Sequence, residues 1–389
     1  MTVDIRRIRP EEYPEAVKLA DEVFRDGGGK SMGATYPMAF SGAYRQSYGA
    51  FEADRLVSFI GLVPNIIRIG AAELRVCSIG AVCTRSEDRG RGYASMILER
   101  VLAHMRAADA PLLLVSGGRP LYRRIGCEEF GVFYRYRIGM SQAGRLAAAD
   151  TSGSAVTIRE LQPEDGFELR RLSRTRVARY EQSLWDLATL IEAEAPAANA
   201  GLRNKVLVAE SAAVAPHRLI GYIVLGTDDK SAAAAGRRES LAVEWAGSAA
   251  AVAALFAEGV RTSGGAGLQA NVPWQEADLL AVLNALSSPP EPVHNEGTAL
   301  ITDAEAFVRQ LRPYWEASGL SGSESMRVEQ TGDRVAVSIG ERSARMSRVQ
   351  FLQLAFEGHV PPEADRRLEE ALRRLFPIPF PSTAGINFV

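Results

Sequence analysis

The chain has 389 residues, 47% of them hydrophobic and 24% charged, which is the size and composition of a globular protein with two or three domains. Its net charge of −2 excludes a strong whole-protein attraction for nucleic acid or for an anionic membrane. The three cysteines form no C-x-x-C pair and exclude a disulfide framework, and no apolar stretch is long enough to span a bilayer. Because the first residues also lack the apolar segment of a signal peptide, we expect a cytoplasmic protein.

The first third of the sequence predicts a mixed α/β unit. An alternating strand precedes Pro10, Glu11 and Glu12, a proline and two acids that suit the first turn of a helix. Further strands are predicted from β-branched and aromatic runs, and the longest helix begins at residue 92 and ends near 105. The predicted strands cover residues 3–8, 56–63, 66–69, 74–84, 112–116 and 129–138. The small, alanine-rich segment 140–154 is typical of a linker.

After this segment the chain repeats itself. The sequence IRRIRPEEYPEAVKL at residues 5–19 aligns without gaps with IRELQPEDGFELRRL at 158–172, an offset of 153 residues. The sequence RLVSFIGL at 55–62 matches RLIGYIVL at 218–225, an offset of 163 residues. Two matches in the same order indicate that a whole domain was duplicated; the alternative is chance similarity between two strand–helix starts.

The second copy differs from the first at one place, and a third region follows it. Residues 240–260 predict a strand and a helix like those of the first copy, but without an arginine–glycine loop. Beyond residue 297 we expect a strand, a helix and a period-2 segment that turns at Gly332-Asp333. The predicted fold is therefore α/β (α+β), with two tandem mixed sheets flanked by helices and a small third domain. The predicted borders are 1–140 for the first domain, 141–155 for the linker, 156–296 for the second domain and 297–389 for the third.

The stretch EDRGRGYASMILERVLAHM at residues 87–105 puts two arginines and two glycines where a helix begins. The first N–H groups of a helix have no intrahelical partner, and the macrodipole makes this end positive. Glycines let a ligand approach the backbone closely and arginines add charged donors, so that the stretch suits a phosphate. Its spacing fits neither a dinucleotide-binding G-x-G-x-x-G loop nor a Walker loop. The alternative is a glycine-rich helix start with exposed arginines.

The surroundings of this stretch resemble a known family. The segment GAVCTRSEDRGRGYASMIL resembles motif A of the GNAT N-acetyltransferases, with Arg89, Gly92 and Ala94 at the fixed positions. The segment PLYRRIGCEEF resembles the family's Y-x-x-x-G-F signature, with Cys127 in place of the phenylalanine. The resemblance implies that acetyl-CoA is the cosubstrate, with its pantetheine arm along the strand and its pyrophosphate at the loop. The residues that it assigns to acetyl-CoA are Val82, Cys83, Thr84, Arg89, Gly90, Arg91, Gly92, Tyr93, Ala94 and Ser95.

The layout of the whole chain resembles the Eis (enhanced intracellular survival) family, in which a competent GNAT domain, a degenerate one and a sterol-carrier-like domain follow one another. Members of that family acetylate amines of aminoglycosides or other multi-amine compounds and are often hexameric. The resemblance therefore implies a small-molecule amine as substrate and a homo-oligomer. It also implies that the C-terminal carboxylate, on Val389, is the general base. The apolar, proline-rich end of the chain is compatible with a docked tail.

The expected chemistry is direct acyl transfer. The backbone N–H of Val82 or Cys83 is expected to polarise the thioester carbonyl. Tyr122, at the family's tyrosine position, is the expected proton donor to the leaving thiolate; the alternative is a packed aromatic side chain at the end of a strand. Cys83 as the nucleophile of a ping-pong route is less favoured than a buried structural cysteine, because no histidine lies near it in sequence.

The acceptor and two other function classes stay open. Glu22 and Asp26, near the end of the first helix, are candidates for contact with a cationic substrate; the alternative is a solvated helix end. The four histidines show no metal-ligand spacing, so we expect no metal site. The alternative functions are acetylation of lysine or N-terminal amines of proteins, and non-enzymatic binding of an acyl-CoA or apolar ligand. A shallow groove would favour a protein acceptor, and a deep acidic pocket would favour a multi-amine one.

Overall fold

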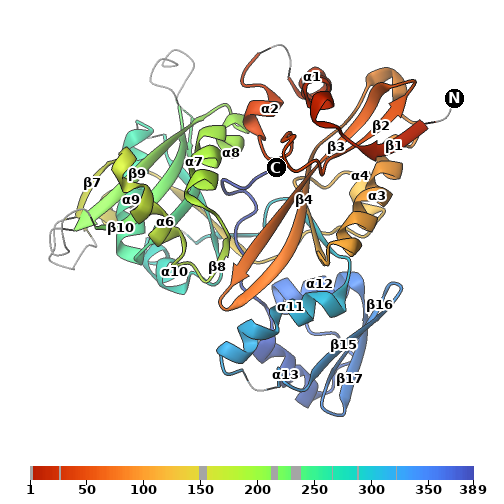
Figure 1. Ribbon diagram of the computed structural model, residues 1–389. Coiled ribbons are helices and arrows are strands. Elements are labelled where there is room, and N and C mark those ends of the chain that lie inside the picture. Colours follow the sequence, from red (N-terminus) through yellow and green to blue (C-terminus); the bar gives the residue numbers. More distant parts are fainter. Residues whose placement is uncertain are drawn as a thin grey trace. The chain divides into compact units, whose positions relative to one another are not determined.

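The computed structural model describes residues 3–25, 28–148, 156–211, 218–228, 238–264, 266–286, 289–320 and 322–389 (Figure 1). The chain divides into two compact units. Unit 1 comprises Met1–Gly131, Glu296–Phe380 and Val389, and unit 2 comprises Val132–Asn295 and Pro381–Phe388. Helices and mixed sheets alternate in both units, which confirms the predicted α/β fold class. Among the described residues, no helix is both long and apolar enough to cross a membrane.

The main sheet of unit 1 has the strand order β1-β2-β3-β4-β5-β14. Its strands are β1 (Val3–Arg7), β2 (Tyr48–Glu52), β3 (Arg55–Ile69), β4 (Ala72–Thr84), β5 (Leu112–Val115) and β14 (Thr298–Ile301). Neighbouring strands are antiparallel except β4 and β5, which are parallel. The sequence predicted two strands where β3 is a single one. Because β2 pairs with β3 only as far as Ile60, Pro64 lies beyond that ladder and its missing N–H breaks none of the β2–β3 hydrogen bonds.

Helices α1 (Tyr13–Phe24) and α3 (Tyr93–Ala107) pack on this sheet. α1 follows η1 (Pro10–Glu12) and contacts β3 and β4, whereas α3 contacts β1, β2, β3 and β4. One side of α3 buries Ile97, Val101 and Met105 in a core that also contains apolar residues of β3, β4 and β5. The shorter helices α2 (Met32–Thr35), η2 (Ser86–Asp88) and α4 (Pro120–Arg123) lie in the connections.

Most of the region predicted as a third domain, up to Phe380, belongs to unit 1, whereas Pro381–Phe388 belongs to unit 2. The part in unit 1 forms a small antiparallel sheet, β15-β16-β17, with three helices in the described residues (Figure 1). Its elements are α11 (Ala304–Ala317), β15 (Met326–Thr331), β16 (Arg334–Ile339), β17 (Arg342–Ser347), α12 (Arg348–Glu357) and α13 (Arg366–Leu375). The turn between β15 and β16 falls at Gly332-Asp333, where the sequence predicted it. Phe356 and Phe380 meet the ring of Phe130 edge to face, so this region shares a core with the segment after β5.

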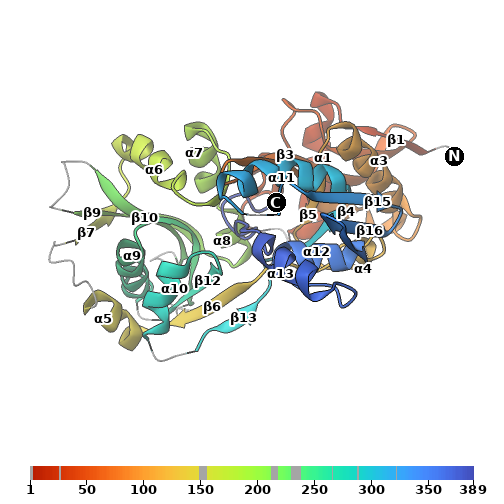
Figure 2. The same cartoon turned by 90° about the horizontal axis from the view of Figure 1, so that it is seen from below.

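The sheet of unit 2 has the order β13-β6-β12-β11-β10-β9-β7 (Figure 2). Its strands are β6 (Phe133–Ile138), β7 (Val156–Glu160), β9 (Arg203–Ser211), β10 (Leu219–Thr227), β11 (Ser240–Gly247), β12 (Leu268–Pro273) and β13 (Glu291–Val293). β11 and β12 are parallel, and the other neighbours are antiparallel. β6 comes from the segment that we assigned to the first domain, yet it pairs with β12. Unit 1 therefore ends its first segment at Gly131 and not at residue 140.

The helices of unit 2 include part of the segment that we expected to be a linker. They are α5 (Met140–Ala148), η3 (Pro163–Asp165), α6 (Gly166–Ser173), α7 (Leu184–Ala193), α8 (Ala195–Asn199), α9 (Ala249–Thr262) and α10 (Ala277–Asn284), and a short strand β8 (Ala178–Tyr180) follows α6. α9 packs on β10 and β11 and contacts α5 and α10 (Figure 2). Ala143 and Leu146 of α5 are buried in this core. Residues 140–148 are therefore a helix that is stabilised by packing, and not a linker. The rest of the predicted linker, 149–155, lies outside the described residues.

The two copies begin with the same ion pair, which supports the duplication. In unit 1 the guanidinium of Arg6 donates to both carboxylate oxygens of Glu12 at 2.8 and 2.7 Å, and Glu12 also accepts from the backbone N–H of Arg9 at 2.8 Å. In unit 2 Arg159 donates to both oxygens of Asp165 at 2.6 and 2.9 Å. Arg159 lies 153 positions after Arg6, and Asp165 lies 153 positions after Glu12. This is the offset of the aligned segments.

Candidate active site

The candidate site is built on the second half of β4. This strand pairs with β5 only as far as Ile79 and then continues to Thr84. On its other side the register against β3 shifts beside Gly61, so that β4 carries a bulge, and Ala81 within it has a φ of 52°. Since the β4–β5 ladder has ended, the backbone of residues 80–84 can pair with an extended ligand as a neighbouring strand would.

The three residues that we predicted beside the pantetheine arm, Val82, Cys83 and Thr84, all lie on this part of β4. The hydroxyl of Ser58 on β3 donates to the carbonyl of Cys83 at 2.9 Å and lies 2.8 Å from the hydroxyl oxygen of Thr84. These bonds hold the end of β4 to β3. The backbone beyond the bulge is thereby fixed before any ligand arrives.

The glycine loop leads directly into the uncapped N-terminus of α3. Gly90 and Gly92 have φ values of 80° and 82°, in the left-handed region that favours glycine. A Cβ on either residue would meet nothing within 4 Å, so the space above the loop is open. Gly92 is the N-cap of α3 and offers no side-chain oxygen. The first N–H groups of α3, on Tyr93, Ala94 and Ser95, are therefore available to an anion.

A cluster of charged and polar side chains holds the loop in this shape. Asp88 is buried and accepts from Arg55 at 2.8 Å and from Arg91 at 3.0 Å. Arg91 also pairs with Glu52 of β2 at 2.6 Å, and the hydroxyl of Tyr93 donates to the same carboxylate. The bond from Tyr93 and the Arg91 guanidinium hold the pKa of Glu52 below its usual range. The loop is thus tied to β2 and β3 by two shielded carboxylates.

This cluster separates the two arginines of the loop. We expected both to contact the pyrophosphate, but the guanidinium of Arg91 is shared between Asp88 and Glu52. Arg89 is exposed, and among the residues that the structure describes its Nε donates only to the carbonyl of Thr84, at a long 3.4 Å. Arg89 is therefore the arginine of the loop that can turn to a phosphate without breaking an ion pair.

Tyr122 lies on α4 and is buried in the same core as Ile79, Val115 and Cys127. Its hydroxyl has no hydrogen-bond partner among the described residues. Burial raises the pKa of Tyr122 to about 12, so the phenol keeps its proton at neutral pH. Burial likewise raises the pKa of Cys83 to about 12. A thiol that is protonated at neutral pH favours the structural reading of Cys83 over the nucleophile.

The C-terminus of the chain lies against the bulge of β4. A Cβ on Gly80 would lie 2.5 Å from the carboxyl carbon of Val389 and 2.8 Å from its oxygen, so only glycine leaves room for the end of the chain. Both residues belong to unit 1. The carboxylate of Val389 thus stands at the point where β4 separates from β5, as Figure 1 shows for the C-terminus beside β4.

Comparison with known protein families agrees with this geometry. Residues 4–130 match a family model described as an acetyltransferase (GNAT) domain. This part of the chain is a GNAT acetyltransferase domain. The protein is accordingly an acyltransferase, and the cosubstrate of its GNAT domain is acetyl-CoA. A search of curated proteins found no match.

Solved structures extend the likeness beyond the GNAT domain to almost the whole chain. A probable N-acyltransferase from Enterococcus faecalis V583 is similar with a TM-score of 0.65 and 16% identity, covering 96% of this chain and 97% of that one. A GCN5-related N-acetyltransferase from Kribbella flavida gives 0.61 and 14%, with 98% and 97% covered. Eis1 from Mycobacterium abscessus gives 0.60 and 14%, with 96% of each chain covered. At these identities the likeness establishes a shared fold.

Of the two predicted substrate residues, one can be placed, and its partner Arg85 directly follows Thr84 at the end of β4. Glu22 is exposed on α1 and pairs with Arg85 at 3.2 Å, so its charge is already balanced. Asp26 lies outside the described residues. The described residues also contain no group of three or more histidine, cysteine, aspartate and glutamate side chains arranged to hold a metal ion.

Sequence reasoning missed three residues that shape the GNAT site. Gly80 makes room for Val389, and the only signal for it is a glycine within a strand, which often marks a bulge or a close approach. Glu52 and Asp88 fix the loop. Asp88 stands beside the motif, but nothing in the sequence links Glu52 to it, because the two residues are 36 positions apart.

Proposed function

We propose that this protein transfers the acetyl group of acetyl-CoA to a primary amine of a small multi-amine substrate, of aminoglycoside or polyamine type, by direct attack. The observation that carries the proposal is the Val389 carboxylate against Gly80, at the bulge of β4. A fixed anion at this point can attract an ammonium group and take its proton. The uncapped start of α3, which suits the donor's pyrophosphate, belongs to the same unit.

In this proposal the donor lies along β4 and ends at the loop. The pantetheine amides pair with the backbone of residues 82–84, and the pyrophosphate accepts from the N–H groups between Gly90 and Ser95. Arg89 adds a charged donor from the exposed side. Arg91 acts indirectly, because its ion pairs with Glu52 and Asp88 hold the loop in its open shape.

The attacking amine must first lose a proton. An alkyl ammonium with a pKa of about 10.4 costs about 4.6 kcal/mol to deprotonate at pH 7. The Val389 carboxylate accepts this proton, directly or through one water, as the nitrogen approaches the thioester carbon. The C–N bond forms, and the backbone N–H of Val82 or Cys83 stabilises the carbonyl oxygen as it becomes negative.

The C–S bond then breaks, and the sulfur of CoA leaves as a thiolate that takes the proton of Tyr122. The nitrogen, which after attack still carries one proton more than the amide product, gives that proton up to the tyrosinate, and Val389 returns its proton to solvent. A phenol with a pKa of about 12 is a poor donor to a thiolate in water, where thiols have pKa values of about 8.5. The two thiols that contribute to the electrostatics around Tyr122, Cys83 and Cys127, have pKa values of about 12. A CoA thiolate in the same low-polarity environment would be matched to the phenol, so that the transfer costs little.

The acceptor class rests on the resemblance to the Eis family and on the negative charge at the end of the chain. A protein amine is the alternative acceptor. The homo-oligomer and the sterol-carrier-like role of residues 297–389 stay predictions of the same resemblance.

The test begins with calorimetric titration of acetyl-CoA, which should reveal one site per chain. Thiol release with kanamycin, neomycin and spermidine as probes then gives kcat. Deleting Val389, or adding one glycine after it, removes or displaces the carboxylate and should lower kcat by about 100-fold with acetyl-CoA affinity unchanged. Tyr122→Phe should lower kcat by about 10- to 100-fold.

Two control variants separate the loss of the carboxylate or the phenol from a general disturbance of the fold. Val389→Ala retains the terminal carboxylate and should retain most of the activity. Tyr314→Phe removes a comparable phenol on α11. Full kcat after deletion of Val389 would rule out the carboxylate as the base. Activity on a lysine peptide but on none of the small amines would show that the acceptor is a protein amine.

A further inference from the structure

The second copy retains the bulge on which the site of the first copy is built. In unit 2 the register of β10 against β11 shifts between Val224 and Leu225, so that β11 carries an extra residue there. In the aligned repeat Val224 corresponds to Gly61, beside which β4 bulges. β11 also pairs with its parallel neighbour β12 only at Ser240 and Leu241, just before the bulge. Both copies therefore have a bulged strand that leaves its parallel neighbour at the same place.

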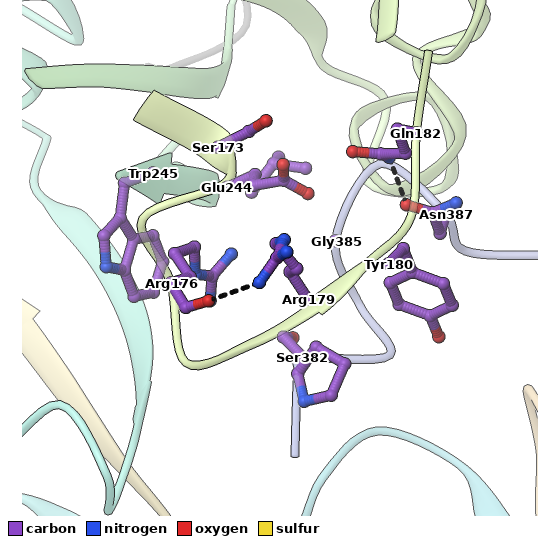
Figure 3. A pocket seen from close by; sticks show the side chains of 12 residues that line it. Ser173, Arg176, Arg179, Tyr180, Gln182, Glu244, Trp245, Ser382, Gly385 and Asn387 are labelled. Carbon is purple, nitrogen blue, oxygen red and sulfur yellow. Dashed lines mark hydrogen bonds between the residues drawn. The ribbon is translucent and has the colours of Figure 1, made fainter. Parts of the chain in front are cut away.

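The bulge of β11 is covered by the chain's own C-terminal tail, residues 381–388. The carboxylate of Glu244 accepts a hydrogen bond from the backbone N–H of Ile386. A Cβ on Gly385 would lie 3.1 Å from Oε2 of Glu244 and 3.8 Å from the carbonyl oxygen of Val243. Figure 3 shows Glu244 and the tail segment around Gly385 on the lining of one small pocket.

Two amide side chains of unit 2 hold the tail on either side of this contact. Gln182 donates from Nε2 to Oδ1 of Asn387 at 2.5 Å, a bond that Figure 3 marks with a dashed line between the two labelled side chains. Asn295 donates to the carbonyl of Pro381 at 3.0 Å and accepts from the backbone N–H of Thr383 at 2.9 Å. Ile386 itself is buried. The tail is thus bound at its beginning, middle and end.

Glu244 is held in place by the groups around it. The hydroxyl of Tyr222 donates to its Oε1 at 3.2 Å, and the guanidinium of Arg176 attracts its charge. Arg176 pairs in turn with Glu276 at 3.2 Å. Burial raises the pKa of the Glu244 carboxyl, against the opposing effect of Arg176. The remaining cavity is about 10 Å³, room for about one water, so no acyl group fits beside the bulge while the tail is there.

These contacts bear on the active site because the tail ends in Val389. Three residues of extended chain span at most about 10 Å, so a bound Ile386 restricts where the terminal carboxylate can go. We propose that Glu244, on the bulge of the second copy, is a positioning residue: it binds the tail at Ile386 and so keeps the Val389 carboxylate against Gly80. This inference rests on the proposed role of Val389 as the base.

The experiment measures the tail and the chemistry separately. Carboxypeptidase Y is added to the folded enzyme, and the release of valine is followed by mass spectrometry. Glu244→Ala should release valine at least 10-fold faster than wild type, whereas Glu244→Gln keeps an acceptor oxygen for Ile386 and should recover most of the resistance. Gln182→Ala, which removes the donor to Asn387, is an independent second variant with the same expected direction. Glu258→Ala is the matched control, because Glu258 is a half-buried carboxylate on α9 that pairs only with Arg261 among the described residues.

The kinetic readout uses kcat for thiol release with kanamycin, neomycin or spermidine, and the dissociation constant of acetyl-CoA. Glu244→Ala should lower kcat about 10-fold and leave the dissociation constant of acetyl-CoA unchanged. In an enzyme that already lacks Val389, the same substitution should cause no further loss of kcat. The positioning role would be overturned if Glu244→Ala lowered kcat equally in the full-length enzyme and in the enzyme without Val389. It would also be overturned if neither Glu244→Ala nor Gln182→Ala changed the rate of valine release. If deletion of Val389 leaves kcat intact, the proposed base fails, while valine release still decides whether Glu244 anchors the tail.

Discussion

The two copies of the duplicated domain differ most clearly at the start of one helix. In unit 1, α3 begins at Gly92, whose φ is 82° and which has no side chain to cap the helix. In unit 2, α9 begins at Ser248, whose hydroxyl accepts from the backbone N–H of Ala251 at 3.3 Å. A capped helix start has fewer free donors for a phosphate. In our proposal the fold has an anion site in one copy and lacks it in the other through a change of cap alone, with the sheet left in place.

The rest of the frame is the same in both copies. The pairs Arg6–Glu12 and Arg159–Asp165 recur at the first strand, and both copies carry a bulge at the corresponding strand. What lies against each bulge differs: the terminal carboxylate of Val389 at Gly80 in unit 1, and the tail at Gly385 in unit 2. The strand bulge is retained, and in our proposals it serves chemistry in the first copy and support of the tail in the second.

The strongest way to test the comparison is to place the same charge at the start of both helices. Gly92→Asp forces a side chain into a left-handed backbone conformation and sets a carboxylate against the pyrophosphate, so acetyl-CoA affinity should fall at least 100-fold. Ser248→Asp keeps a capping oxygen and should leave the affinity unchanged. Calorimetric titration of both variants decides. Similar losses from the two substitutions would contradict a single site in unit 1.

A smaller effect should separate the two arginines of the loop, which have no counterpart in the second copy. Arg89→Ala removes an exposed hydrogen-bond donor for the phosphate. It should lower the affinity for acetyl-CoA about 10-fold, with little change in the melting temperature. Arg91→Ala leaves Asp88 and Glu52 without their shared partner and should lower the melting temperature by several degrees. Titration and thermal unfolding of each variant test this. If Arg91→Ala lowered the acetyl-CoA affinity and Arg89→Ala lowered the melting temperature, Arg91 would be the arginine that binds the phosphate.

The last prediction concerns pH and the buried thiols, all three of which lie in unit 1. Burial raises the pKa of each thiol to about 12, from about 9. Above about pH 9 the unfolded chain loses protons that the folded chain keeps, so the free energy of unfolding falls by about 1 kcal/mol per thiol and pH unit. The contribution is complete below pH 9 and is lost as the pH rises towards 12.

Urea unfolding at pH 8, 9 and 10 measures this slope. A variant with all three cysteines changed to alanine should be less stable at pH 8 but should show a flatter dependence on pH. Thiol reagents at pH 8 should react slowly with the folded protein. Fast reaction of the folded protein would mean that the thiols are not shielded, and the predicted slope would then be absent.

The local parts of the GNAT site could be read from the sequence because local rules control them. The glycines at 90 and 92, the helix that follows and the tyrosine at 122 belong to short motifs, and the structure has the loop, α3 and α4 at these positions. The repeat was visible because the aligned segments keep the residues that form the Arg6–Glu12 type of pair. Two strands predicted at 56–63 and 66–69 became one, because pairing with β4 continues past Pro64.

The parts that could not be predicted depend on partners distant in sequence. The strand 133–138 belongs to the sheet of unit 2 and β14 to the sheet of unit 1, since strand pairing is decided by which sheet edge is available. Arg91 carries the same charge as Arg89, and only the folded positions of Glu52 and Asp88 give the two arginines different tasks.

The sequence by itself thus determined the fold class, the repeat and the glycine loop at the start of α3, because short-range periodicity and backbone freedom at glycine set them. Only the tertiary structure decided where the chain's last residue lies and what fills the bulge of the second copy. A terminal carboxylate has no sequence motif, and its position against Gly80 follows from contacts with residues more than 300 positions away.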